Sequence, residues 1–214
     1  PVPLPNAEGK VLYVWFDAPI GYVSMTKEWA ISIGEPDAWK SYWQNEDCKL
    51  VHFIGKDNIV FHTIIFPAML MAMNQNYVLP HNVPANEFLN LEGDKLSTSR
   101  NYAVWVNEYL EKFSADSLRY YIAANAPETK DADFTWKNFQ QHHNSELADT
   151  LGNFVNRAIT FTHKYFDGKL PMQGSFDDLD RLALEKLSSI SNDVAFHLER
   201  YELRKSTETI MEFA

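Results

Sequence analysis

Short apolar runs alternate with helical patterns over the first hundred residues of the chain. Residues 10–17 (KVLYVWFD) and 48–55 (CKLVHFIG) are rich in β-branched and aromatic side chains, which is typical of buried strands. Apolar residues at helical spacing follow each run; the first helix is expected to end at Gly34, and the second to begin near Asp57 and kink at Pro67. Alternating strands and helices predict an α/β domain with a mostly parallel sheet.

Helical spacing dominates after about Tyr102. The stretch 81–95 still predicts short strands and turns, and it leads into a polar loop at 93–101 (GDKLSTSRN). Two short amphipathic helices are then expected, the second with Ser114 or Asp116 as its cap.

The remainder of the chain predicts an all-α region. Residues 127–134 (PETKDADF) indicate a polar connection, 136–165 a long helix, and 176–214 a second helix after the turn FDGKLP. Together these predict an antiparallel hairpin that begins a helical bundle.

Composition and charge narrow the function classes. Charged residues are 22% and apolar residues 45%, as in ordinary soluble proteins, and no apolar run has the roughly 18 residues of a membrane span. The net charge of -10 argues against DNA and against indiscriminate nucleic-acid binding, but not against RNA on one local surface. Cys48 is the single cysteine, which excludes an internal disulfide and a Cys-rich zinc site. The opening residues do not form a secretory signal, so we expect a cytoplasmic protein without a membrane partner.

Two strand-to-helix turns are candidate ligand sites, because ligands bind at the carboxyl ends of parallel strands. In 14–22 (VWFDAPIGY), the rings of Trp15 and Tyr22 flank such a turn, although a core tryptophan and a proline that starts a helix explain the same pattern. In 53–58 (FIGKDN), the Asp57 carboxylate can accept hydrogen bonds from the hydroxyls of a ribose. Alternatively, Asp57 is simply the N-cap of a helix.

A histidine pair in this region does not predict a metal site. A histidine on an apolar helix, such as His62, is typically a hydrogen-bonded core residue. His52 is ten residues away, and no third metal ligand is evident for the two histidines.

The 93–101 loop has the composition of a polyphosphate site. Lys95 offers a positive charge, and the serines and threonine offer neutral donors to oxygens that become negative during phosphoryl or nucleotidyl transfer. The spacing is not that of a P-loop. Considered alone, the segment is more typical of a solvated surface turn.

The three segments in this order, VWFDAPIGY, FIGKD with FH, and KLSTS, resemble the methionyl-tRNA synthetase family, which is one of the class I aminoacyl-tRNA synthetases. The resemblance continues through ADSLRYYIAANAPETKDADFTW and LGNFVNRAITFTHKYFDGKLP, so it spans nearly the whole chain. It implies the second half of a class I Rossmann-type nucleotide-binding fold over 1–100, a linking region over 101–135, and the first part of an anticodon-binding helical bundle over 136–214.

The resemblance also implies a reaction and its site. Members activate methionine with ATP and Mg2+ to give methionyl-adenylate and pyrophosphate, and then transfer the methionyl group to tRNA(Met). By motif match, the implied methionine-binding residues are Trp15, Ala18, Pro19, Tyr22, Ile59, Phe61 and His62. The implied ATP-binding residues are Gly55, Asp57, Leu89, Lys95 and Thr98, and the implied catalytic residues are Lys95, Ser97, Thr98 and Arg100. Asn153 and Arg157, four residues apart on one helical face, match positions that read the anticodon; without the family they are typical solvated residues.

Two departures from the family pattern affect this site. KLSTS stands where KMSKS is usual, so Thr98 replaces the second of two lysines that stabilise the departing pyrophosphate. A hydroxyl cannot replace an ammonium charge, and our hypothesis is that Arg100 or a group elsewhere in the enzyme supplies it. The stretch 83–89 (VPANEFL) also lacks the His-Gly pair of many members.

The resemblance implies a fragment. The family's HIGH-type signature, and a connective domain that carries zinc in many members, precede the matched region, so we expect no adenylate formation by this chain alone. The alternatives are a non-catalytic tRNA-binding module derived from such an enzyme and another nucleotidyltransferase of the same fold.

Overall fold

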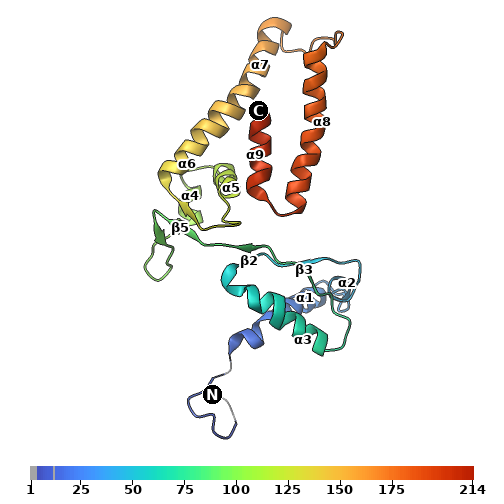
Figure 1. The fold of residues 1–214 in the computed structure, drawn as a ribbon, viewed down its shortest axis with the longest axis vertical. Helices are drawn as coiled ribbons and strands as arrows, with labels where there is room; N and C mark the ends of the chain where they lie inside the picture. The colour runs from blue at the N-terminus through green and yellow to red at the C-terminus, as the bar shows by residue number, and fades with distance from the viewer. Residues whose placement is uncertain (1–3, 12) are drawn as a thin grey trace. The chain divides into compact units, whose positions relative to one another are not determined.

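The computed structural model describes residues 4–11 and 13–214. The chain forms two compact units, Pro1–Asn86 and Glu87–Ala214 (Figure 1). The predicted limits at residues 100 and 135 concern functional domains and stay predictions.

The first unit is a mixed α/β structure with small parallel sheets. Strand β1 (Leu50–Val51) pairs with β3 (Pro80–Asn82), and β2 (Ile54–Gly55) pairs with β4 (Ala85–Asn86), both in parallel. Along the chain, the helical segment over residues 56–72 connects β2 to β3. This confirms the predicted strands within 48–55 and 81–95. Its elements are η1 (Val14–Phe16), η2 (Ala18–Ile20), α1 (Gly21–Ser32), α2 (Lys40–Trp43), β1 (Leu50–Val51), β2 (Ile54–Gly55), η3 (Lys56–Asn58), η4 (Phe61–Ile65), α3 (Phe66–Ala72), β3 (Pro80–Asn82) and β4 (Ala85–Asn86).

The strand predicted over 10–17 is wrong. Val14–Phe16 forms a short 3-10 helix, and the side chains of Val11 and Tyr13 are 78% and 66% exposed. β-branched and aromatic residues favour a strand only where neighbouring strands can pair with it and cover it. Leu12 lies outside the described residues, and none of the described strands pairs with residues 10–11 or 13–17.

The helix after β2 changes geometry before its proline. A π-helical turn occupies Phe61–Ile65, and α3 starts at Phe66 with Pro67 in its first turn. Proline has no N–H to donate and its ring clashes with the carbonyl one turn earlier, so it is tolerated at a helix start. The helix thus changes from π to α geometry just before Pro67, and a kink at this proline stays a prediction.

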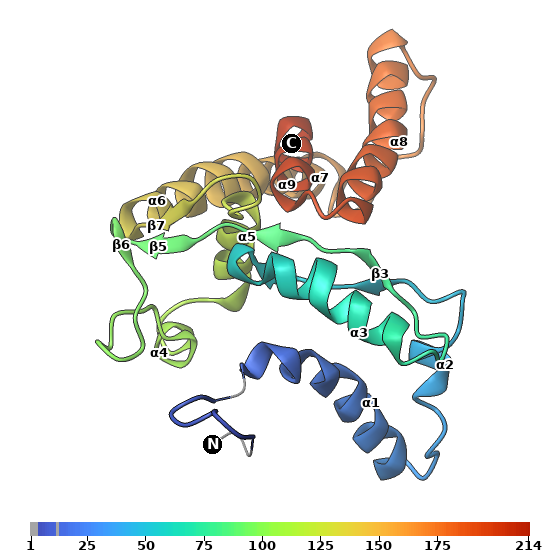
Figure 2. The same cartoon turned by 60° about the horizontal axis from the view of Figure 1, so that its bottom comes forward.

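The core of the first unit gathers around α1 and α3, which lie side by side (Figure 2). Phe66 is fully buried there, together with Val23, Ala30, Trp39, Trp43, Leu70 and Tyr77. We expect Phe66→Ala to lower the free energy of unfolding by about 3–5 kcal/mol, because it removes buried surface and leaves a cavity. Chemical denaturation measures this, with Met71→Ala, on the same helix and 67% exposed, as the control. An equal loss in both variants would contradict the assigned core.

The second unit combines a small sheet with helices. β5 pairs with β6 in antiparallel and with β7 in parallel. Its elements are β5 (Leu89–Leu91), β6 (Asp94–Lys95), α4 (Val106–Leu110), α5 (Ala115–Ala124), β7 (Ala132–Phe134), α6 (Trp136–His142), η5 (His143–Gly152), α7 (Asn153–Phe166), α8 (Asp178–Glu199) and α9 (Leu203–Phe213). Ser114 caps α5 by accepting a hydrogen bond from the Ser117 N–H, as one of the two predicted caps.

Two predictions for this unit are wrong. The connection predicted over 127–134 contains β7, whose Phe134 is buried in the core with Leu91, Tyr109, Tyr121 and Phe139. The single helix predicted over 176–214 is two helices, α8 and α9, which lie side by side and antiparallel (Figure 1). Tyr201 between them has a φ of 65°, which no α-helix continues.

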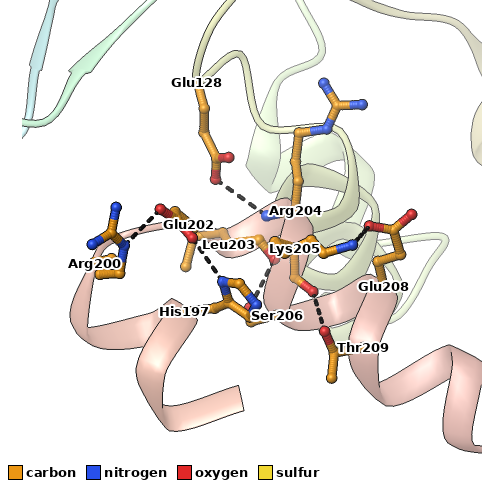
Figure 3. A network of polar contacts seen from close by, with 10 residues as sticks. All are labelled: Glu128, His197, Arg200, Glu202, Leu203, Arg204, Lys205, Ser206, Glu208 and Thr209. Atoms are coloured by element: carbon orange, nitrogen blue, oxygen red, sulfur yellow. Dashed lines mark hydrogen bonds and ion pairs between the residues drawn. The ribbon is translucent and has the colours of Figure 1, made fainter. Parts of the chain in front are cut away.

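Polar contacts hold the turn between α8 and α9 (Figure 3). The Glu202 carboxylate lies 2.7 Å from Nδ1 of His197 and accepts a hydrogen bond from Nε of Arg200 at 2.9 Å. The Glu128 carboxylate accepts the Arg204 N–H at 3.1 Å, next to the start of α9. Of these contacts, the one to Glu128 satisfies a backbone N–H at the start of α9, and the other two join side chains across the turn.

Candidate functional site

Two rings stack at the start of the first unit. Trp15, in η1, and Phe61, the first residue of η4, lie with ring centroids 4.8 Å apart and planes 16° apart. Both rings are half-buried, so each keeps surface that a ligand can reach. Flat aromatic faces of this kind suit a flexible thioether.

A hydrogen-bond chain runs behind this stack. Nδ1 of His62 lies 2.9 Å from the carbonyl oxygen of Asn58, which can only accept, so Nδ1 carries the proton. In the tautomer with the proton on Nδ1, Nε2 is the acceptor for the Tyr22 hydroxyl at 2.9 Å. His62 is 1% exposed, whereas Tyr22 is 41% exposed. We call Trp15, Tyr22, Phe61 and His62 the aromatic cluster.

The other predicted methionine residues lie on neighbouring segments of the first unit and outside these contacts. Ala18 and Pro19 are in η2, where Ala18 is exposed and Pro19 is buried. Ile59 follows η3 and is 40% exposed.

His52 adjoins the aromatic cluster, although the sequence predicted no role for it. Its ring centroid lies 5.0 Å from that of His62 and 5.3 Å from that of Tyr22. Burial, with a smaller effect of nearby His62, lowers the pKa of His52, because a buried imidazolium loses its hydration. The one sequence signal was a histidine within an apolar strand-like run.

The Gly55–Asp57 turn leaves its carboxylate on the surface. Gly55, not Asp57, occupies the position before the 3-10 helix η3, and no side chain caps that helix. The reading of Asp57 as a simple cap is therefore wrong. Asp57 is exposed in the first turn, and a Cβ added to Gly55 would meet nothing within 4 Å, so the space beside this backbone is open.

The 93–101 loop grows out of a tight hairpin. Glu92 and Gly93 have φ angles of 49° and 85° between the paired residues Leu91 and Asp94. Two positive φ angles are typical of the turn that joins antiparallel strands, and glycine adopts one without strain. The Asp133 carboxylate on β7 accepts the Gly93 N–H at 2.9 and 3.0 Å, and so anchors the turn.

The loop closes on itself beyond β6. Ser97 and Tyr102 exchange backbone hydrogen bonds of 2.9 and 2.8 Å across its neck. Inside the loop, the Ser97 hydroxyl lies 3.2 Å from that of Ser99 and accepts the Arg100 N–H at 3.3 Å.

Two cations lie on this closed loop. Nη2 of Arg100 donates to the Lys95 carbonyl oxygen at 3.3 Å, which brings the guanidinium back over the loop. Nζ of Lys95 lies 5.3 Å from the centre of the Phe88 ring. Lys95, Thr98 and Arg100 are exposed, so the loop presents both cations and the threonine to solvent.

The remaining predicted residues belong to other parts of the second unit. Leu89 begins β5 opposite Ala132 and packs against the core. Asn153 and Arg157 line one open cavity of about 540 Å3 on α7, which confirms that they share a face.

The described residues contain no group of three or more His, Cys, Asp or Glu side chains that could hold a metal ion. We derive no step of the reaction through a metal ion bound by these residues alone. None of the helices in this part of the chain is long and apolar enough to cross a membrane.

Comparisons with known proteins place this geometry in a family. Residues 1–159 match the family described as tRNA synthetases class I (M). Methionine–tRNA ligases of Porphyromonas gingivalis and Flavobacterium psychrophilum are 56% and 57% identical to the chain over its whole length. The chain spans 31% of the length of each of these relatives.

Solved structures agree with this match. The structure of Mycobacterium tuberculosis methionyl-tRNA synthetase bound by methionyl-adenylate is similar to 98% of this chain, with a TM-score of 0.78 and 27% identity. This chain covers 39% of that one. The free-state structure of the same protein has a TM-score of 0.74 and 26% identity.

Proposed function

We propose that this chain, which belongs to the class I tRNA synthetase family (M), is part of an enzyme that activates methionine with ATP and joins it to tRNA(Met). The aromatic cluster carries the proposal, because a stacked pair beside a hydrogen-bonded Tyr–His pair suits a thioether amino acid. Since the chain spans 31% of its relatives, we assign the activity to the whole enzyme, in which residues 1–100 contribute the second half of a Rossmann-type fold.

The first step forms the adenylate. A carboxylate oxygen of methionine attacks the α-phosphorus of ATP, and the bond from that phosphorus to the bridging oxygen breaks. Pyrophosphate leaves with the electron pair, so negative charge grows on its oxygens. Lys95 stabilises that charge, Ser97 and Thr98 offer hydroxyl donors, and Mg2+ enters with ATP as part of the substrate.

Other residues hold the reactants. Trp15, Phe61 and Tyr22 contact the methionine side chain, with Ala18, Pro19, Ile59 and His62 completing the pocket. Asp57 accepts the ribose hydroxyls, Gly55 lets the nucleotide approach the backbone, and the β5 backbone at Leu89 lies beside the adenine.

Methionine-dependent ATP–pyrophosphate exchange tests the proposal, with this chain compared with the whole enzyme. Exchange only in the whole enzyme is the expected result. Exchange by the chain alone would show that residues 1–214 suffice for adenylate formation. No exchange in either protein would favour the alternative, a tRNA-binding module, and exchange without methionine selectivity would favour another nucleotidyltransferase.

Arg100 is proposed to supply the charge that Thr98 does not. Its guanidinium already lies over the loop, bonded to the Lys95 carbonyl. Arg100→Ala in the whole enzyme is expected to lower kcat for exchange about tenfold, the order of one hydrogen bond to a charged group. Arg119→Ala, which removes an exposed arginine paired with Asp116 on α5, is the control. An unchanged kcat in Arg100→Ala means that another group supplies the charge.

Asn153 and Arg157 are proposed to read anticodon bases, because amide and guanidinium groups suit the edges of unstacked bases. Arg157→Ala is expected to raise KM for tRNA about tenfold and to leave pyrophosphate exchange unchanged, since exchange needs no tRNA. Lys164→Ala removes a positive charge from the same helix and is the matched control. Equal effects of both variants on aminoacylation would indicate nonspecific charge attraction.

A further inference from the structure

One buried nitrogen beside the aromatic cluster has no hydrogen-bond partner among the residues that the structure describes. Nε2 of His52 is inaccessible to solvent and makes no hydrogen bond within the described part of the chain. The side chain as a whole is 7% exposed. An unmade hydrogen bond in the interior is costly, so such a group calls for an explanation.

The backbone holds His52 in place. Its N–H donates to the Asn82 carbonyl oxygen at 3.0 Å, which ties it to the end of β3. Its ring packs on Tyr22 from α1, His62 from η4 and Phe66 from α3, at centroid distances of 5.3, 5.0 and 5.8 Å.

Among these ring neighbours, only Tyr22 has hydrogen-bonding capacity left. Both nitrogens of His62 are used, one by Asn58 and one by Tyr22, and Phe66 has no polar atom. The Tyr22 hydroxyl spends its proton on His62, which leaves its oxygen lone pairs as acceptors. Burial keeps His52 neutral by lowering its pKa, so that ring carries a single proton to donate.

We propose that His52 is a positioning residue of the methionine site. When methionine binds, the partly exposed side chain of Tyr22 rotates. Its hydroxyl then accepts a hydrogen bond from Nε2–H of His52 while it still donates one to His62. The completed series of hydrogen bonds runs from His52 through Tyr22 and His62 to the backbone of Asn58. It holds the Tyr22 ring against the substrate. This inference rests on the proposed function of the aromatic cluster.

The test uses methionine-dependent exchange by the whole enzyme. His52→Phe keeps a ring but removes the donor, and is expected to raise KM for methionine about 3- to 10-fold, the worth of one neutral hydrogen bond. His52→Gln restores a donor and is expected to recover most of that loss. kcat and KM for ATP should not change in either variant.

A double-mutant cycle separates the bond from packing. In a Tyr22→Phe background the acceptor is gone, so His52→Phe is expected to have no further effect on KM for methionine. If His52→Phe lowers the melting temperature, His52→Asn and His52→Leu replace it, because their side chains have the same number of heavy atoms and the same branching, and only Asn has a donor. The Asn variant should keep the lower KM.

Several outcomes would overturn the inference. These are a wild-type KM in His52→Phe, equal losses in the Phe and Gln variants, or additive effects with Tyr22→Phe. If the wild-type whole enzyme shows no methionine-dependent exchange, that result would instead count against the proposed function itself.

Discussion

Lys95→Met in the whole enzyme is expected to lower kcat for ATP–pyrophosphate exchange by about 10²–10³-fold, while KM for methionine stays within about twofold. Methionine keeps the length of the side chain and removes its charge. Lys95 lies at the end of the β5–β6 hairpin, where the loop presents it to solvent. The Lys95 ammonium is proposed to stabilise the negative charge that develops on the departing pyrophosphate. Its removal is therefore expected to lower kcat and to leave methionine binding unchanged.

Lys169→Met is the matched control for this experiment. Lys169 is also exposed, in the turn after α7, and the substitution changes the net charge equally. Its kcat should stay near that of the wild type. An equal loss in both variants would point to a general effect of charge, and a raised methionine KM in Lys95→Met would place Lys95 near the amino acid instead.

Trp15→Ala is expected to raise KM for methionine by about 10- to 100-fold, because it removes the proposed contact between the indole ring and the sulfur of methionine, and also the stack that orients Phe61. The centroids of the two rings are 4.8 Å apart and the rings are nearly parallel, so without Trp15 the Phe61 ring loses the packing contact that orients it. Isothermal titration with methionine and the KM from exchange both report this change. KM for ATP should stay near the wild-type value.

Trp29→Ala controls for the loss of a tryptophan from the same unit. Trp29 is 42% exposed and lies edge-on to Tyr42 on the surface, away from the contacts of the aromatic cluster. Its KM for methionine should not change. If Trp15→Ala also leaves KM unchanged, Trp15 is only a packing residue, which is the alternative that the sequence pattern left open.

The residues of the candidate site were named from motifs, but their relations came from the fold. The sequence placed Tyr22 and His62 in separate helices without a contact, and the structure joins them by a hydrogen bond of 2.9 Å. It also added His52, because burial and an unpartnered nitrogen cannot be read from a single histidine in an apolar run. The roles of these residues in binding and catalysis stay predictions.

Helices were predicted better than strands. The helix expected from residue 136 was confirmed, since a periodic apolar face is a property of the segment itself. The strand predicted at 10–17 was wrong because strand formation depends on a partner, and β7 was missed because its three residues are too short to show a pattern.

Local patterns in the sequence were enough to predict the helical character of the chain after about Tyr102, the charge of the 93–101 loop and the family that these motifs resemble. Each depends on side chains close together in the chain. The tertiary structure decided which rings stack, which histidine nitrogen carries a proton, and that Asp133, forty residues away, anchors the loop at Gly93. These depend on contacts between distant segments, and the free energy of such contacts exists only once the chain has folded and excluded water.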